Sequence, residues 1–305
     1  GTAYAILAGV YAWIAGYGQE PEYYALGIEA AGKVIGDPNY RLVASPEEVC
    51  TEVLPGNSEE GIFEVCYDDS RGEYKDFGSY IGGTVEKWPV LKGTTPASRR
   101  KFFIRNETVE RLYTPEDLRL QAYFADFFRM KEEPVSVTQG AAYVRMWREV
   151  EYYSGGIYDG TPRTLLANDI LIRLPDILLL RAEMKAATGD REGAVADLDV
   201  VRRRAGVAGY SEAEGDLRRA IQLERDRELL FQTGVRYFDY MRNHTYNLLK
   251  GGFRDLTETD VAAGALFLPV SLDAMNNNLS TKLALWLSLN SSVAKKLISG
   301  HIIQA

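Results

Sequence analysis

Histidine and cysteine are scarce in this chain of 305 residues, which contains only His244, His301, Cys50 and Cys66. A structural zinc site needs four closely spaced ligands of these types, so none is predicted. Glycine-rich phosphate-binding loops and the nucleophile elbow of hydrolases are also missing. No cofactor and no metal site is therefore predicted. The two cysteines could form a disulfide or remain free thiols.

Clustered positive charge is lacking as well. The chain has 35 Lys and Arg against 43 Asp and Glu, a net charge of −8, and its longest basic run is Arg202–Arg204. Nucleic-acid binding depends on clustered positive charge, so no such partner is expected. Residues 1–19 carry no charge, but four glycines and several polar or aromatic residues interrupt the run of about 20 apolar residues that a membrane span needs. We interpret this segment as a buried helix.

Apolar residues recur at helical spacing in two distant segments, 2–36 and 173–206. Each segment is predicted to form a helix pair of about 34 residues, which is the length of a tetratricopeptide unit and must stack on neighbours. We predict a mainly α fold, in which tetratricopeptide-like helix pairs flank a loop-rich insertion containing short strands. The expected organisation is one domain over 1–305, with these parts: a helix pair at 1–40, the insertion at 69–165, a helical scaffold at 170–243 and an unassigned tail at 283–305.

The insertion is rich in glycine, tyrosine and serine, and we expect strands at 124–130 and 142–149. A long loop-rich stretch in a helical protein often carries function. Flat aromatic rings match the C–H faces of sugars, whereas carboxylates match their hydroxyl groups. The predicted ligand-binding residues are Tyr80, Trp88, Trp147, Tyr152, Tyr153, Tyr158 and Asp159. Each aromatic residue could instead pack in a core.

Residues 224–242 are dense in charge, and we interpret them as structural rather than catalytic. Glu224 and Glu228 lie four residues apart, so one helix face carries both. Arg225 and Arg227 lie between them, and we expect this helix to form ion pairs with Arg236, Asp239 and Arg242 of the following segment.

Four sequence blocks occur in an order that resembles the SusD/RagB family of outer-membrane nutrient-binding lipoproteins of Bacteroidetes-type bacteria. They are Arg173–Glu183 (RLPDILLLRAE), Leu198–Val207 (LDVVRRRAGV), Glu224–Phe231 (ERDRELLF) and Val235–Arg242 (VRYFDYMR). Family members are usually several hundred residues long, so the chain resembles an N-terminally truncated or short member.

The resemblance implies a SusD-like fold and a non-catalytic, cell-surface protein that binds oligosaccharide and delivers it to a SusC-like TonB-dependent transporter. It also implies an outward-facing position on the outer membrane, with membrane contact only through a lipid anchor that this chain lacks. The family has no fixed motif for ligand contacts, so the aromatic candidates are not carried over from it.

Two other functions are weighed against this one. A tetratricopeptide-type scaffold would bind a protein or peptide. A glycosidase would need two carboxylates about 5 to 9.5 Å apart, for which Asp68/Asp69 or Glu151/Asp159 could be nominated. An acidic cluster of Asp68, Asp69, Glu73 and Asp76 could attract calcium, but its spacing fails the EF-hand pattern and favours a solvated loop. We predict no enzymatic activity.

Overall fold

The computed structural model describes residues 1–73, 80–95, 102–232, 235–248 and 257–266. The chain divides into two compact units, Gly1–Thr245 and Tyr246–Ala305. The tail at 283–305 and Asp76 lie outside the described residues, and the single domain over 1–305 remains a prediction. Within the described ranges, every helix is too short or too polar to span a bilayer.

Helices dominate the first unit. Those outside the insertion are α1 (Thr2–Gly16), α2 (Tyr23–Ile35), α3 (Pro46–Glu48), the π-helical turn η1 (Val49–Val53), α9 (Leu174–Thr188), α10 (Arg191–Arg204), the 3₁₀ turn η4 (Glu212–Glu214), α11 (Leu217–Glu228) and α12 (Val235–Arg242). The second unit contains the turn η5 (Tyr246–Leu248) and α13 (Glu258–Ala262), which begins with a capping box at Thr257.

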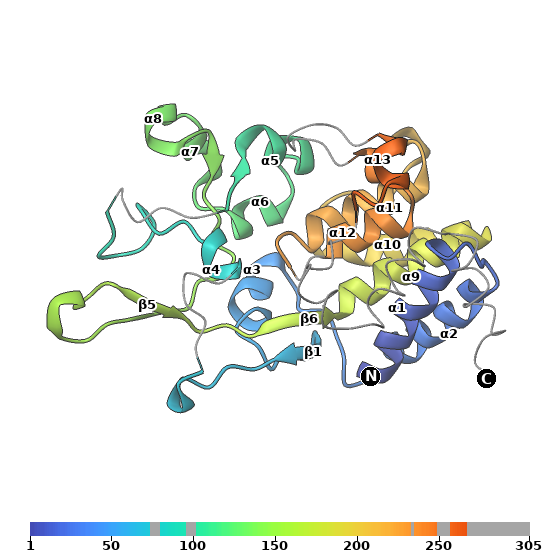
Figure 1. Ribbon diagram of the computed structural model, residues 1–305, viewed down its shortest axis with the longest axis horizontal. Helices are drawn as coiled ribbons and strands as arrows, with labels where there is room; N and C mark the ends of the chain where they lie inside the picture. The colour runs from blue at the N-terminus through green and yellow to red at the C-terminus, as the bar shows by residue number, and fades with distance from the viewer. Residues whose placement is uncertain (74–79, 96–101, 233–234, 249–256, 267–305) are drawn as a thin grey trace, which may run out of the picture. The chain divides into compact units, whose positions relative to one another are not determined.

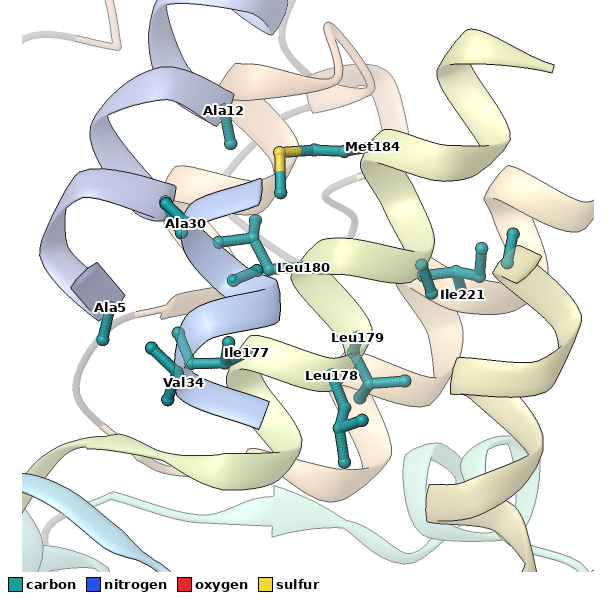
Figure 2. Packing of buried hydrophobic residues seen from close by; sticks show 14 of the residues in the cluster. Ala5, Ala12, Ala30, Val34, Ile177, Leu178, Leu179, Leu180, Met184 and Ile221 are labelled. Atoms are coloured by element: carbon teal, nitrogen blue, oxygen red, sulfur yellow. The ribbon is translucent and has the colours of Figure 1, made fainter. Parts of the chain in front are cut away.

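The two predicted helix pairs stack on each other, although more than a hundred residues separate them in the sequence. Helix α2 packs against both α1 and α9, and α9 in turn contacts α10 and α11. Figure 1 shows these helices gathered at one end of the first unit. Alanines line the buried face of α1, and Figure 2 shows Ala12 and Ala30 facing Leu180 and Met184 of α9. The prediction of a mainly α fold with stacked helix pairs is confirmed.

Local sequence signals set the limits of these helices. Gly189 has a positive φ of 88° and ends α9, and the Asp190 side chain accepts a hydrogen bond from the Gly193 N–H (3.0 Å) to cap α10. The Asp216 side chain caps α11 in the same way through the Arg219 N–H (2.8 Å). The breaks between helices are therefore encoded in the sequence next to them.

A short antiparallel ladder brackets the insertion. Strand β1 (Gly61–Val65) pairs with β6 (Asp169–Arg173), so the chain leaves and re-enters the helical layer at adjacent positions. The elements between them are the turn η2 (Asp69–Arg71), α4 (Tyr80–Thr84), β2 (Ile104–Arg105), α5 (Asn106–Leu112), α6 (Leu118–Tyr123), α7 (Phe127–Lys131), α8 (Val135–Thr138), β3 (Ala141–Ala142), β4 (Val150–Tyr152), η3 (Gly156–Tyr158) and β5 (Pro162–Leu165). The expected short strands are present.

The two longer strands expected at 124–130 and 142–149 are wrong in extent. Main-chain pairing between these two segments is limited to a bridge between Phe124 and Val144 and the bonds beside it, and Ala142 pairs instead with Ile104 of β2. Asp126 adopts a left-handed conformation with φ of 46°, which turns the chain out of the pairing direction and into α7. Phe124 and Val144 belong to a second hydrophobic cluster, separate from that of the stacked helices. This insertion core also takes in residues of η1, among them Val49, Cys50 and Val53.

Buried charges join the helical layer to the insertion. Arg119 of α6 is fully buried and contacts Glu224 (2.6 Å) and Glu228 (3.3 Å) of α11. Glu228 also pairs with Arg173 (2.7 Å) and Arg204, the latter from the end of α10. Glu224 also pairs with Arg227 of α11 itself (3.2 Å). The other arginines that bind Glu224 and Glu228 are distant in sequence, because α11 turns these two carboxylates toward α6 and α10.

Arg236 and Asp239 of the following segment do pair with α11, through Asp226 and Arg225. Arg242 binds Glu183 of α9 (2.7 Å) and Asp239 (2.6 Å), and Asp239 also accepts from Arg225 of α11 (2.6 Å). Arg236 is half-exposed and contacts the buried Asp226 (3.1 Å). These pairs fix α12 against α9 and α11.

The arginines control the ionisation of the buried acids. Burial disfavours the charged form of Glu228, but Arg204, Arg173 and Arg119 outweigh it and lower its pKa to about 2. Burial likewise opposes ionisation of Glu224, but Arg119, Arg227 and Arg202 lower its pKa below the usual value. Asp226 behaves in the opposite way, because burial outweighs Arg236 and raises its pKa.

Candidate functional site

A β-hairpin carries four of the predicted ligand-binding residues. Strands β4 and β5 pair from Val150↔Leu165 to Tyr152↔Pro162, and the backbones of Tyr153 and Thr161 continue the ladder (2.9 Å). Figure 1 shows the hairpin as an extended ribbon that ends in a tight loop.

Two tyrosines form an exposed aromatic pair at the end of this hairpin. The ring centroids of Tyr153 and Tyr158 are 5.7 Å apart, and the ring planes are inclined by 39°. The two residues are 41% and 59% exposed, so both rings have faces open to solvent. Ile157 between them is 90% exposed, and sequence reasoning missed it because an isolated isoleucine carries no binding signal. The tip therefore offers an apolar contact surface.

Hydrogen bonds within the loop hold this pair in place. Asp159 accepts a bond from the Gly155 N–H through Oδ1 (2.5 Å), and the Thr161 hydroxyl donates to the Tyr158 carbonyl (2.6 Å). Asp159 thus braces the loop beside Tyr158, in addition to any ligand contact it makes. Tyr152 is half-buried at the base of the loop, next to the exposed pair.

The segment that contains Trp88 packs against the same hairpin. Trp88 is half-buried, and the Thr94 hydroxyl closes the turn after it by donating to the Leu91 carbonyl (2.7 Å). Gly93 has a φ of 67°, and a Cβ there would collide with the Gly160 carbonyl of the hairpin loop. Only glycine fits this approach. The structure therefore brings the Trp88 turn into contact with the hairpin.

One predicted aromatic residue does not contribute to this surface. Trp147 is 3% exposed and packs in the core of the insertion, so the prediction that it contacts ligand is wrong. Tyr80 begins α4, and its side chain lies outside the described residues.

Three of the carboxylates nominated for other chemistry, Glu151, Asp159 and Asp68, already have partners, and the side chain of Asp69 lies outside the described residues. Glu151 pairs with Arg163. Asp68 accepts hydrogen bonds from Ser70 and pairs with Arg71 (3.1 Å). Among the described residues, no group of three or more His, Cys, Asp or Glu side chains could hold a metal ion.

The two cysteines are free thiols in different environments. Cys66 is exposed, whereas Cys50 is buried in the insertion core. Burial raises the pKa of the Cys50 thiol to about 12, so this thiol is un-ionised and unreactive at neutral pH.

The fold and the candidate site together define a scaffold of helix pairs that displays an inserted, aromatic-tipped surface. The SusD family model matches residues 59–282. The chain belongs to the SusD family, as its four sequence blocks indicated. This family is non-catalytic, in agreement with the prediction that the chain is not an enzyme.

Solved structures show the same fold. A SusD homologue from Bacteroides thetaiotaomicron matches with a TM-score of 0.74 and 22% identity, over 91% of this chain and 58% of that one. Surface glycan-binding protein A from the same organism matches with a TM-score of 0.62 and 22% identity, over 90% and 62%. The latter protein in complex with laminarihexaose gives a TM-score of 0.58 and 21% identity, over 87% and 63%.

This chain therefore spans about three-fifths of the length of these structures. A comparison with curated proteins found no match.

Proposed function

We propose that the chain is the main part of a non-catalytic, cell-surface glycan-binding protein. In this proposal it captures oligosaccharide and delivers it to a SusC-like TonB-dependent transporter, on the outside of the outer membrane and held by a lipid anchor in the full-length protein. Family membership and a relative solved with laminarihexaose support the glycan ligand. Transporter and location rest on the family alone.

The exposed pair of Tyr153 and Tyr158 is the observation that carries the proposal. Each aromatic platform adds about 0.5–1.5 kcal/mol beyond the area it buries. Together with Trp88 and a few hydrogen bonds, two such platforms give affinities in the micromolar-to-millimolar range. Binding of this strength suits a protein that must release its cargo to a partner.

A glycan array followed by isothermal titration calorimetry tests the proposal. We expect binding of at least one oligosaccharide class, and Tyr153→Ala or Tyr158→Ala should weaken it about two- to tenfold without changing the melting temperature. Tyr4→Ala is the matched control, because Tyr4 is 46% exposed on α1, outside the insertion. Binding that is lost equally in the control, or absent for every glycan, contradicts the proposal.

One observation favours a tetratricopeptide-type interaction scaffold as a second candidate. The outer face of α1 exposes four apolar or aromatic residues at helical spacing, namely Tyr4, Ile6, Leu7 and Val10. Such a face fits an apolar protein segment. Isothermal titration calorimetry of wild type and Val10→Asp with oligosaccharides separates the two functions, since only the glycan-binding function predicts that both proteins bind a sugar.

A further inference from the structure

A small pocket lies beside the turn that carries Trp88. It has a volume of about 240 Å³, and Pro89, Val90 and Met130 contribute apolar walls. Pro89 follows Trp88 directly in the sequence, so the pocket adjoins the aromatic part of the candidate site. The pocket is large enough for a substituent of a sugar ring rather than for a whole oligosaccharide.

The floor of the pocket is built by the short pairing around Phe124 and Val144. The Ala125 N–H donates to the Tyr143 carbonyl (2.8 Å), and the Arg145 N–H donates to the Tyr123 carbonyl (2.9 Å). Side chains alternate between the two faces of extended backbone. Val144 therefore enters the core, whereas Tyr143 and Arg145 line the pocket.

The charges in the pocket are not balanced. Arg129 is neutralised by Asp126 (3.2 Å) and Glu133 (3.6 Å). The half-buried Arg145 guanidinium makes no hydrogen bond or ion pair with any side chain in the described part of the chain. The Arg145 charge acts on Glu47 at longer range, but that carboxylate is bound by Arg148. Arg145 thus brings a guanidinium without a paired carboxylate to a concave site in a protein whose net charge is −8.

We infer that this pocket receives the anionic group of an acidic sugar, a carboxylate or a sulfate, with the Arg145 guanidinium as its donor. The inference rests on the proposed function and specifies its ligand class. A planar guanidinium can donate two parallel hydrogen bonds to either group, and the apolar walls limit access of water to the pair. A neutral oligosaccharide gains none of these bonds.

Titration calorimetry with three probes tests the inference: an oligogalacturonate, which carries only carboxylates, a carrageenan oligosaccharide, which carries only sulfates, and neutral laminarihexaose. We expect wild type to bind one of the acidic probes more tightly than the neutral one. Arg145→Gln should weaken that acidic binding about tenfold to a hundredfold and leave neutral binding unchanged. The two acidic probes decide whether the pocket prefers carboxylate or sulfate.

Arg129→Gln is the matched control, because it removes a guanidinium from the same pocket whose charge is already neutralised. Arg145→Lys keeps the charge and should retain part of the acidic binding, which separates an electrostatic role from damage to the fold. Tight binding of the neutral probe alone, or equal losses in the Arg145→Gln and Arg129→Gln variants, overturns the inference and leaves the proposed function standing. Failure of every glycan to bind wild type overturns both.

Discussion

Replacement of Glu228 by glutamine tests whether the buried charges hold the fold together. The carboxylate of Glu228 lies among Arg119, Arg173 and Arg204, all buried, and the variant would leave these guanidinium groups facing a neutral amide. Loss of one partner from a buried ion network is strongly destabilising, because the desolvated charges that remain lose their compensation.

The size of the effect follows from the pKa of this carboxyl group. Its fall from 4.5 to about 2 corresponds to about 3 kcal/mol of stabilisation at neutral pH. Loss of one member of a buried pair costs about 3–5 kcal/mol in general. We therefore expect Glu228→Gln to lower the free energy of unfolding by about 3 kcal/mol or more.

Urea unfolding at pH 7 and at lower pH provides the measurement. The native-state pKa of Glu228 lies below the unfolded value, so its stabilisation is complete above pH 4.5 and is lost as the pH falls toward 2. Stability of Glu228→Gln should accordingly fall less steeply than that of wild type in this window.

The control is Glu212→Gln, which breaks the exposed pair with Arg191 and should cost less than about 1 kcal/mol. Equal losses of stability in the two variants would refute the reasoning.

Three further predictions concern other parts of the fold. Trp147→Ala should lower the free energy of unfolding by about 3–5 kcal/mol in urea titrations, since it opens a cavity in the insertion core, and a variant that melts like wild type would show that the indole is not buried. Arg236→Ala should cost about 1 kcal/mol, because its partner is buried although Arg236 is half-exposed; binding of oligosaccharide should be unchanged, and a loss of binding with unaltered melting would assign Arg236 to the site. Gly93→Ala should weaken oligosaccharide binding in calorimetry by forcing the Trp88 turn away from Gly160, whereas Gly72→Ala, at a similar φ of 75° with open space around it, should leave binding intact.

The stacking of the helices could be predicted because its signals are local. Apolar periodicity marks the buried faces of the helices. Gly189 and Asp190 mark the boundary between α9 and α10, and the residues they bond lie within four positions of them in the sequence. A helix pair of about 34 residues cannot bury its apolar face alone, so each pair needs a neighbour, and the two pairs pack on each other.

The ion network shows what local sequence signals cannot predict, namely the partners of buried charges that come from distant segments. The charge density of α11 correctly suggested a helix rich in ion pairs, but apart from Arg227 the partners of Glu224 and Glu228 come from α6, β6 and α10. Sequence spacing contains no information about which distant arginine reaches a given carboxylate. Pairs within one segment or between neighbours, such as Arg242 with Asp239, were the predictable part.

For a similar reason, some of the predicted aromatic residues are exposed and others are buried. Tyr153 and Tyr158 flank glycines in a hairpin loop, and a loop of this kind exposes its side chains. Trp147 instead follows the short pairing around Val144, and its side chain packs in the insertion core. Residue type and neighbouring glycines cannot show which face of an irregular segment the core covers. The pocket at Arg145 was likewise invisible, because its walls come from residues 89–90 and 125–145.

The pairing of Glu60 with Arg204 determines how much of the chain must be synthesised before the first unit can fold. The two residues are 144 positions apart, and Arg204 and Arg173 contact Glu60 as well as Glu228. A ribosome must therefore release nearly the whole of the first unit before this cluster can close. Until then Glu60 lacks the arginines that pair with it. The first unit therefore completes its folding late in synthesis, because the contacts that close it join residues far apart in the sequence. Truncation anywhere before residue 228 should accordingly yield a chain that proteases degrade rather than a smaller stable protein.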